Sequence, residues 1–218
     1  MTVTYEQLLD ELLPADLPHR EVCASGCARH LRLIEEANRQ FNLTRIVDAR
    51  EAVVKHVVDS VTPWRLFGGA ARVVDAGTGA GFPGIPLAFA HPESRWVLIE
   101  STGKKARFAE SAGQALGLAN IEVEPVRAED WLRAHRVDIV TARAVAPLVK
   151  ILDLFGPAAR AGARLLLYKG PDVDAEIAET AAYAAKRGLA AQVALRYELP
   201  EGMGSRTVVQ VASAGQAI

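Results

Sequence analysis

The segment VVDAGTGAGFPG, residues 73–84, constrains the fold more than any other part of the chain. Four of the seventeen glycines fall in it, directly after the β-branched residues Val73 and Val74. Read from Gly79, its last six residues match the G-x-G-x-x-G pattern of nucleotide-binding turns. Such a turn joins a buried strand to a helix, so the segment predicts an α/β fold whose first strand ends at a ligand site.

From residue 71 onward, short runs of β-branched and aliphatic residues alternate with helical segments. We expect strands at 71–77, 95–100, 120–126, 137–143 and 163–169, and helices at 83–91, 103–117, 147–158 and 172–188. The last two strands, 190–199 and 205–212, have no helix between them and are expected to pair antiparallel. The alternation predicts a Rossmann-like, mostly parallel sheet with an antiparallel terminal strand, which binds ligands beyond the carboxyl ends of its strands.

Helical segments precede this alternation. In residues 20–41, five apolar side chains recur at helical spacing, which predicts an amphipathic helix: Cys23, Cys27, Leu31, Ile34 and Phe41. A short acidic helix ending near Pro14 comes before it, and a third helix at 51–61 leads to Pro63. We therefore expect a single domain, 1–218, with a helical N-terminal cap at 1–68 and a Rossmann-like core at 69–213.

The two cysteines raise the question of a metal site. Cys23, Cys27 and His30 fall near one face of the predicted helix. Zinc takes four protein ligands, or three and a water, and the chain has no third cysteine to complete a thiolate site. The buried face of a helix is therefore the favoured interpretation, and we expect no metal.

Charge and hydropathy limit the partners. The chain has 25 Lys and Arg against 26 Asp and Glu, so contact with a polyanion requires a local basic patch. The first twenty residues lack the basic start and apolar stretch of a signal peptide, and no apolar run reaches the length of a membrane span. We expect a cytoplasmic protein with no membrane partner.

Charge also decides which ligand suits the glycine turn. Asp75 ends the first strand, where its carboxylate would repel a dinucleotide's pyrophosphate but attract the sulfonium and ammonium groups of S-adenosylmethionine. Glu100 ends the second strand, where a carboxylate can accept both ribose hydroxyls of either ligand. S-adenosylmethionine is thus favoured, with an NAD-dependent oxidoreductase as the alternative. A purely structural role, in which both acids cap helices, is also open.

The segment after the fourth strand narrows the range of possible methyl acceptors. Methyltransferases acting on exocyclic amines carry an Asn/Asp-Pro-Pro-aromatic loop here, whereas this chain has TARAVAPL. Pyrimidine carbon methylation needs a nearby cysteine nucleophile, and both cysteines lie in the cap. Arg143 instead puts a cation at the strand end, able to bind the donor's carboxylate, a guanine oxygen or a phosphate. An aromatic ring nitrogen has a free lone pair and needs no catalytic base, so positioning would supply the rate.

Five blocks in order carry a resemblance to a known family. They are NLTRIVDAREAVVKHVVDS (42–60), VVDAGTGAGFPGIPLA (73–88), STGKKARF (101–108), ARAVAPL (142–148) and YKG (168–170). Together they resemble the bacterial RsmG/GidB family of small-subunit (16S) ribosomal RNA guanosine-7 methyltransferases, over most of the chain. The resemblance implies a class I S-adenosylmethionine-dependent methyltransferase fold, S-adenosylmethionine as cofactor, and a guanosine of 16S ribosomal RNA in the small ribosomal subunit as acceptor.

The resemblance also implies a site. The positions that match the family's donor-binding positions are Gly77, Phe82, Ala128, Glu129 and Arg143. The cofactor site is further expected to include Asp75, Gly79, Gly81, Glu100 and Ser101. Basic side chains near the strand ends, together with one histidine, are expected to contact RNA: Arg45, Lys55, His56, Lys104, Lys105, Arg143, Lys169 and Arg206. We expect no catalytic base and a monomer. A non-catalytic RNA-binding assembly factor is the non-enzymatic alternative.

Overall fold

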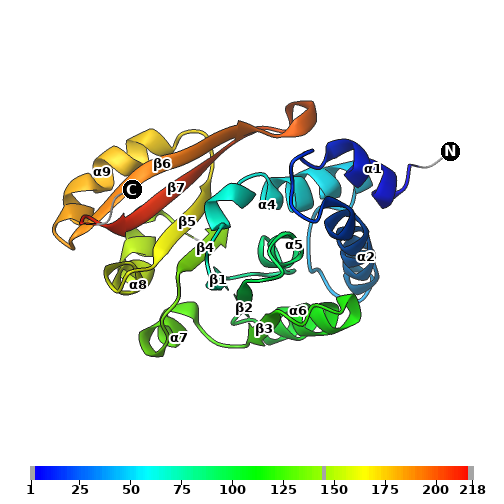
Figure 1. The fold of residues 1–218 in the computed structure, drawn as a ribbon, viewed down its shortest axis with the longest axis horizontal. Coiled ribbons are helices and arrows are strands. Elements are labelled where there is room, and N and C mark those ends of the chain that lie inside the picture. Colours follow the sequence, from blue (N-terminus) through cyan, green and yellow to red (C-terminus); the bar gives the residue numbers. More distant parts are fainter. Residues whose placement is uncertain (1–2, 144–145, 216–218) are drawn as a thin grey trace.

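The computed structural model describes residues 3–143 and 146–215. Within these residues, seven strands form one sheet in the order β3-β2-β1-β4-β5-β7-β6 (Figure 1). Their bounds are β1 Arg72–Ala76, β2 Arg95–Ile99, β3 Ile121–Glu124, β4 Ile139–Arg143, β5 Arg164–Lys169, β6 Leu189–Glu198 and β7 Ser205–Ser213. Strands β1 to β5 are parallel, and β7 pairs antiparallel with β5 and β6. The expected α/β fold with an antiparallel end is confirmed.

Helices cover both faces of this sheet (Figure 1). One face carries α5 Gly84–Ala90 and α6 Gly103–Leu116, and the other carries α7 Ala128–Ala134, α8 Leu148–Arg160 and α9 Val173–Ala185. The N-terminal helices are α1 Tyr5–Leu12 and α2 Arg20–Asn38. Helix α2 packs over α5 and α6, and α1 packs against α2. The cap therefore forms an additional layer on one side of the molecule.

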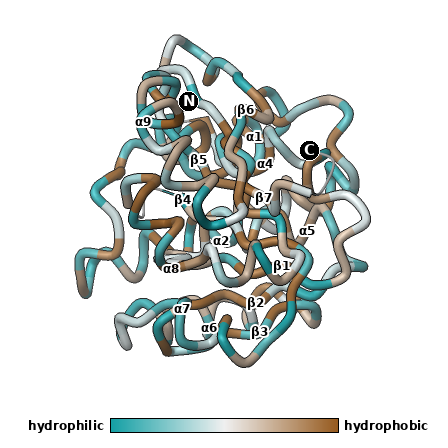
Figure 2. Tube along the Cα trace, turned by 90° about the vertical axis from the view of Figure 1, so that its left-hand side faces the viewer, coloured by the Kyte–Doolittle hydropathy of each residue, from teal (hydrophilic) through white to brown (hydrophobic). Residues whose placement is uncertain are grey.

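Two hydrophobic cores result, because neighbouring residues of a strand point to opposite faces. Val73 and Val74 of β1 are both fully buried, but Val73 packs on the α5 side and Val74 on the α8 side. Cys27 and Leu31 of α2 belong to the same cluster as Val73, so the cap and the sheet share one core. Figure 2 shows hydrophobic residues gathered in the inner strands and helices, with hydrophilic residues along the outer turns.

The helix expected at 51–61 contains a wider turn. The structure divides this region into α3 Ala49–Ala52, a π-helical turn η1 Val53–Val58 and α4 Asp59–Val61. The backbone N–H of Asp59 donates to the carbonyl of Val54, five residues back, where an α-helix would use the fourth. The Ser60 hydroxyl donates to the carbonyl of His56, which belongs to the same π-helical turn.

Three short elements were not expected from the sequence. They are α7 and the two 3-10 turns η2 Trp64–Phe67 and η3 Pro200–Gly202. Helix α7 has only seven residues, and its buried residues Ala128, Trp131 and Leu132 do follow the i, i+3, i+4 spacing of a helix. A segment this short repeats the spacing only once, which is too little for sequence periodicity to indicate a helix.

Glycine is required at several positions of the turn after β1. Gly77, Gly79 and Gly81 have positive φ angles of 78°, 60° and 94°. Gly84 begins α5, where a Cβ would lie 2.2 Å from the Leu98 side chain, so only glycine lets α5 pack this close to β2. A Cβ on Gly79 would meet no described atom nearer than 4.0 Å, which leaves open space over this part of the turn.

Candidate functional site

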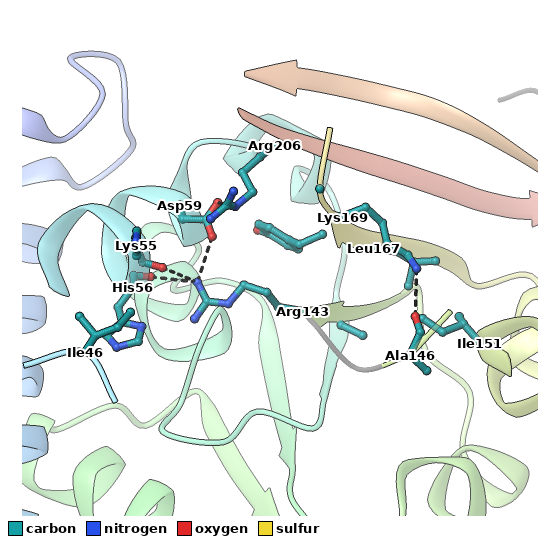
Figure 3. A pocket seen from close by; sticks show the side chains of 13 residues that line it. Ile46, Lys55, His56, Asp59, Arg143, Ala146, Ile151, Leu167, Lys169 and Arg206 are labelled. Atoms are coloured by element: carbon teal, nitrogen blue, oxygen red, sulfur yellow. Dashed lines mark hydrogen bonds and ion pairs between the residues drawn. The ribbon is translucent and has the colours of Figure 1, made fainter. Parts of the chain in front are cut away.

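A cavity of about 580 Å³ opens at the carboxyl ends of β4 and β5. Figure 3 shows its lining: η1 and α4 contribute from one side, β4 and β5 from the other, and β7 from above. Five of the residues predicted to contact RNA line it: Lys55, His56, Arg143, Lys169 and Arg206. The fold thus brings together side chains that lie up to about 150 positions apart in sequence, at the edge of the sheet where a ligand was expected.

Arg143, the last residue of β4, holds the η1 turn in place. Its Nη1 lies 3.0 Å from the carbonyl oxygen of Lys55 and 3.4 Å from that of His56 (Figure 3). The same nitrogen lies 3.4 Å from the carboxylate of Asp59, and the side chain is 17% exposed. Arg143 therefore orients the residues that line the cavity. Its predicted contact with a bound ligand stays a prediction.

Asp59 is the acidic centre of the cavity, and sequence reasoning missed it. Its carboxylate accepts a hydrogen bond from the Tyr197 hydroxyl at 2.8 Å and pairs with Arg143 at 3.4 Å and Arg206 at 3.5 Å. Burial, and secondly the charge of Asp59, raises the pKa of the Tyr197 and Tyr168 phenols. The available signal was its place four residues after Lys55, but a carboxylate at that spacing is equally typical of a solvated helix face.

His56 and Phe82 connect the cavity to the glycine turn. Their rings are 4.6 Å apart and nearly parallel, with 9° between the planes, and the guanidinium carbon of Arg143 lies 5.4 Å from the Phe82 ring centre. The Nε2 atom of His56 is 3.1 Å from the Thr44 hydroxyl. Burial, and secondly the charge of Arg143, lowers the pKa of His56 to about 3. The imidazole is therefore neutral at neutral pH, so any contact it makes with RNA does not use a positive charge.

Carboxylates neutralise most of the positive charge at the cavity. Lys55 pairs with Glu51 at 2.6 Å, and Lys169 pairs with Glu176 at 3.0 Å. The two arginines share Asp59. Four cations against three carboxylates leave a net charge of +1, which favours an anionic ligand without making the cavity a strongly basic surface.

Asp75 lies beneath the glycine turn. It is fully buried, and its Oδ2 accepts hydrogen bonds from the Thr78 hydroxyl at 2.6 Å and the Gly84 N–H at 2.8 Å. Its Oδ1 is buried and has no hydrogen-bond partner among the described residues. Burial raises the pKa of Asp75 to about 6. The carboxylate anchors the turn and the start of α5, and its direct pairing with a cationic donor stays a prediction.

Glu100 connects the glycine turn to α6. Its Oε2 accepts from the Gly79 N–H at 3.1 Å and its Oε1 from the Thr102 N–H at 2.7 Å, where Thr102 is the N-cap residue of α6. Asp75 and Glu100, the carboxylates at the ends of β1 and β2, therefore both accept hydrogen bonds at the start of a helix, which is the structural role that the sequence left open. The contact expected between Glu100 and a ribose stays a prediction.

The other predicted cofactor residues follow the same edge of the sheet. Ser101 is exposed just after β2, Ala128 is buried at the first position of α7, and Glu129 beside it is half-buried. The edge provides open space over Gly79, backbone with positive φ, and the unpartnered buried oxygen of Asp75. These features fit a ligand that needs close backbone approach and carries positive charge, as S-adenosylmethionine does.

Three predicted RNA contacts lie outside the cavity. Lys104 and Lys105 are in the first turn of α6, and Lys104 lines a groove of about 440 Å³ between α2 and α6 with Phe41 and Phe108. Arg45 is exposed in the loop before α3. Residues 144 and 145 of the ARAVAPL block lie outside the described residues.

Residues 3–143 and 146–215 contain neither a membrane-spanning helix nor a cluster of metal ligands. None of the helices there combines the length and the apolar character needed to cross a bilayer. These residues also contain no group of three or more His, Cys, Asp or Glu side chains placed to hold a metal ion. Cys23 and Cys27 are buried free thiols with sulfur atoms 3.8 Å apart, in keeping with the buried helix face.

Comparisons with known proteins agree on one family. The family model described as rRNA small subunit methyltransferase G matches residues 25–198. A relative from Solibacter usitatus (strain Ellin6076), named ribosomal RNA small subunit methyltransferase G, is 62% identical over 209 residues, which cover 96% of this chain and all of the relative. A relative of the same name from Symbiobacterium thermophilum is 41% identical, with 84% of this chain and 78% of the relative covered.

Solved structures of methyltransferases share the fold. The O-methyltransferase TomG from Streptomyces achromogenes, solved in complex with SAM, aligns with a TM-score of 0.56 at 22% identity and covers 85% of this chain and 90% of its own. A precorrin-6y C5,15-methyltransferase from Geobacter metallireducens aligns with a TM-score of 0.55 at 14% identity, covering 72% and 87%. At these identities the likeness establishes the class I methyltransferase fold.

Proposed function

The chain belongs to the rRNA small subunit methyltransferase G family, and on this premise we propose that it methylates nitrogen-7 of a guanosine in 16S ribosomal RNA. Methylation of small-subunit ribosomal RNA with S-adenosylmethionine as donor is the activity of the family. The proposal adds two points: which atom accepts the methyl group, and which parts of the site bind the donor and the acceptor. An NAD-dependent oxidoreductase, the alternative reading of the glycine turn, is set aside.

The observation that supports the proposal best is the contact between the glycine turn and the cavity. Phe82 belongs to the turn, and its ring packs on His56 and lies 5.4 Å from the guanidinium carbon of Arg143, two residues that line the cavity. We assign the donor to the turn, with Gly77, Gly79, Gly81 and Phe82 beneath it. The acceptor base enters the cavity at the ends of β4 and β5. Donor and acceptor then meet directly, where the turn borders the cavity next to Phe82.

The residues of the site suit an acceptor that loses no proton. The donor supplies an electrophilic methyl group, and a guanine N7 has a free lone pair to receive it. His56 is the imidazole that lines the cavity, and its pKa of about 3 makes it a poor proton acceptor at neutral pH. Arg143 binds Asp59 and the η1 backbone, and so fixes the shape of the cavity. Catalysis by positioning follows from this chemistry.

RNA contacts outside the acceptor base divide between two surfaces. Lys169 and Arg206 line the cavity, and Lys104 and Lys105 lie at the start of α6. We propose that both groups bind phosphates that flank the modified guanosine. Arg45 extends this surface toward the cap. We also propose that the chain acts as a monomer in the cytoplasm. Sedimentation analysis of the purified protein tests the monomeric state.

A methyl-transfer assay on small ribosomal subunits tests the proposed function. Subunits purified from cells that lack this gene are incubated with the protein and isotopically labelled S-adenosylmethionine, and the RNA is digested to nucleosides for mass spectrometry. Label in 7-methylguanosine is the expected result. Label in a ribose or in an exocyclic amine would contradict the acceptor assignment. No transfer at all would favour a non-catalytic RNA-binding role.

A further inference from the structure

A histidine of the cap contacts the glycine turn from the side opposite the sheet. His30 lies on α2 and is fully buried. Its Nε2 atom is 2.8 Å from the carbonyl oxygen of Ala80, fifty residues along the chain. Ala80 stands between Gly79 and Gly81, in the middle of the turn assigned to the methyl donor. The cap therefore makes a direct polar contact with the donor turn.

The partner fixes the tautomer of His30. A carbonyl oxygen only accepts hydrogen bonds, so Nε2 must carry the proton and donate it. The Nδ1 atom is buried and has no partner among the described residues. Burial lowers the pKa of His30 to about 4, so the ring is neutral at neutral pH. A neutral ring with hydrogen on Nε2 is the form that the contact requires.

The imidazole ring also packs on the turn. Its centre lies 4.8 Å from that of Phe82, which has His56 against it at 4.6 Å. A Cβ on Gly81 would approach the Cε1 atom of His30 to 3.2 Å, so the ring already lies close to the turn's backbone. The ring thus limits movement of Gly81 and Phe82, while the hydrogen bond limits movement of Ala80.

We propose that His30 is a positioning residue of the methyl-donor site: its Nε2–H holds the Ala80 carbonyl and keeps the turn 79–82 in the conformation that binds S-adenosylmethionine. The inference rests on the proposed function and extends it to the N-terminal cap. The His30 ring also stacks on Phe108 of α6, but His30 does not line the acceptor cavity, so its loss weakens donor binding and leaves the residues that line that cavity in place. The hydrogen bond, more than the bulk of the ring, carries the effect.

Two substitutions of similar shape separate hydrogen bonding from bulk. His30→Gln places an amide N–H near the position of Nε2, whereas His30→Met fills similar space without a donor. His91 offers the matched control, because it is a buried histidine whose Nε2 lies 3.0 Å from the carbonyl oxygen of Trp64, at the far end of α5. His91→Met and His91→Gln therefore report the cost of losing or keeping such a bond away from the donor turn.

Calorimetric titration with S-adenosylmethionine is the primary measurement. We expect His30→Met to raise the Kd about tenfold, from the loss of one buried hydrogen bond, and His30→Gln to stay within about twofold of wild type. Both His91 variants keep the wild-type Kd, even where they lower the melting temperature. The KM for S-adenosylmethionine rises in His30→Met, and the KM for small ribosomal subunits does not. A folded His30→Met protein with wild-type donor affinity overturns the inference, as does a tenfold loss in His30→Gln.

A measurement on the wild-type protein does not depend on the folding of a variant. The 15N chemical shifts of the two ring nitrogens of His30 report the tautomer directly. We expect hydrogen on Nε2, with and without S-adenosylmethionine, and hydrogen on Nδ1 would overturn the inference. Wild-type protein that fails to bind S-adenosylmethionine would instead contradict the proposed function, so the two failures are distinct.

Discussion

Asp59 and Asp75 are both buried carboxylates, but their surroundings differ in charge. Asp59 has two arginines and a tyrosine hydroxyl around it. Asp75 is held by a hydroxyl and a backbone amide, and one of its oxygens has no partner among the described residues. A charge without a paired cation is costly to bury, which is why the pKa of Asp75 rises.

This raised pKa predicts a pH-dependent gain in stability for Asp75→Asn. Between the unfolded value of 3.8 and the folded value of about 6, the folded protein holds the proton of Asp75 more tightly than the unfolded chain does. Wild type therefore loses stability as pH rises through this window. Relative to wild type, Asp75→Asn should gain up to about 3 kcal/mol in free energy of unfolding by pH 7 and little at pH 4. Denaturant unfolding of both proteins across pH checks this, and a difference independent of pH would contradict it.

Arg143 predicts a difference between two conservative substitutions. Arg143→Lys keeps the charge but replaces the planar guanidinium, whose Nη1 reaches the carbonyls of Lys55 and His56, by a compact ammonium. Loss of such charged hydrogen bonds should lower the single-turnover methylation rate by about tenfold to a hundredfold. Arg206→Lys is the control, because Arg206 contacts Asp59 at 3.5 Å, is more exposed, and should lose less than about threefold. Equal losses in the two variants would mean that Arg143 acts as a point charge.

Among the secondary elements, the π turn η1 shows what sequence reasoning reached and what it missed. The strands were predicted from short continuous runs of β-branched and aliphatic residues, and most helices from apolar residues that recur near every fourth position. The residues of η1 were predicted as plain helix, since VVKHVVDS has apolar residues at helical spacing. The wider turn depends on bonds from Arg143 and Ser60 to its carbonyls, and Arg143 comes about ninety residues later. The place of Asp59 in the cavity could not be predicted for the same reason.

Helix α6 predicts a second, electrostatic surface. Lys104 and Lys105 lie in its first turn, and Lys104 is exposed at the groove beside α2. Replacing both by Ala should weaken RNA binding and reduce the slope of log K against log salt by about 0.7 to 0.9 for each phosphate that the protein no longer neutralises. S-adenosylmethionine affinity should not change. Lys186→Ala, on an exposed position after α9, serves as the control, and filter binding at several salt concentrations is the measurement. An unchanged slope would indicate that these lysines contact no phosphate and only form a solvated helix face.

At the scale of the whole molecule, the cap and the core form one hydrophobic unit. Gly26 of α2 lies so close to α5 that a Cβ would come within 2.3 Å of the Phe89 ring, and cap and sheet residues share one cluster. The family and the fold class expected from the sequence are both confirmed. The five sequence blocks, taken in their order along the chain, were enough to predict both the family and the fold class. Contacts of the cap with these blocks, such as that of His30 with Ala80, appear only when the cap is folded onto the core.

Because neither histidine beside the donor turn and the acceptor cavity changes its charge near neutrality, the rate of the whole reaction should be nearly independent of pH there. His56 and His30 have pKa values lowered to about 3 and about 4, so neither changes charge near neutrality. These shifts destabilise the fold only as pH falls below the ordinary histidine value of 6.5, which sets the lower limit of the measurement. We expect the single-turnover rate, at saturating donor and small ribosomal subunits, to stay within about twofold from about pH 6.5 to 8.5. His56→Gln, which keeps a polar group beside Phe82, should leave this profile flat. A rate that rises with pH in wild type and becomes flat in His56→Gln would show that His56 removes a proton, and would exclude guanine nitrogen-7 as the acceptor.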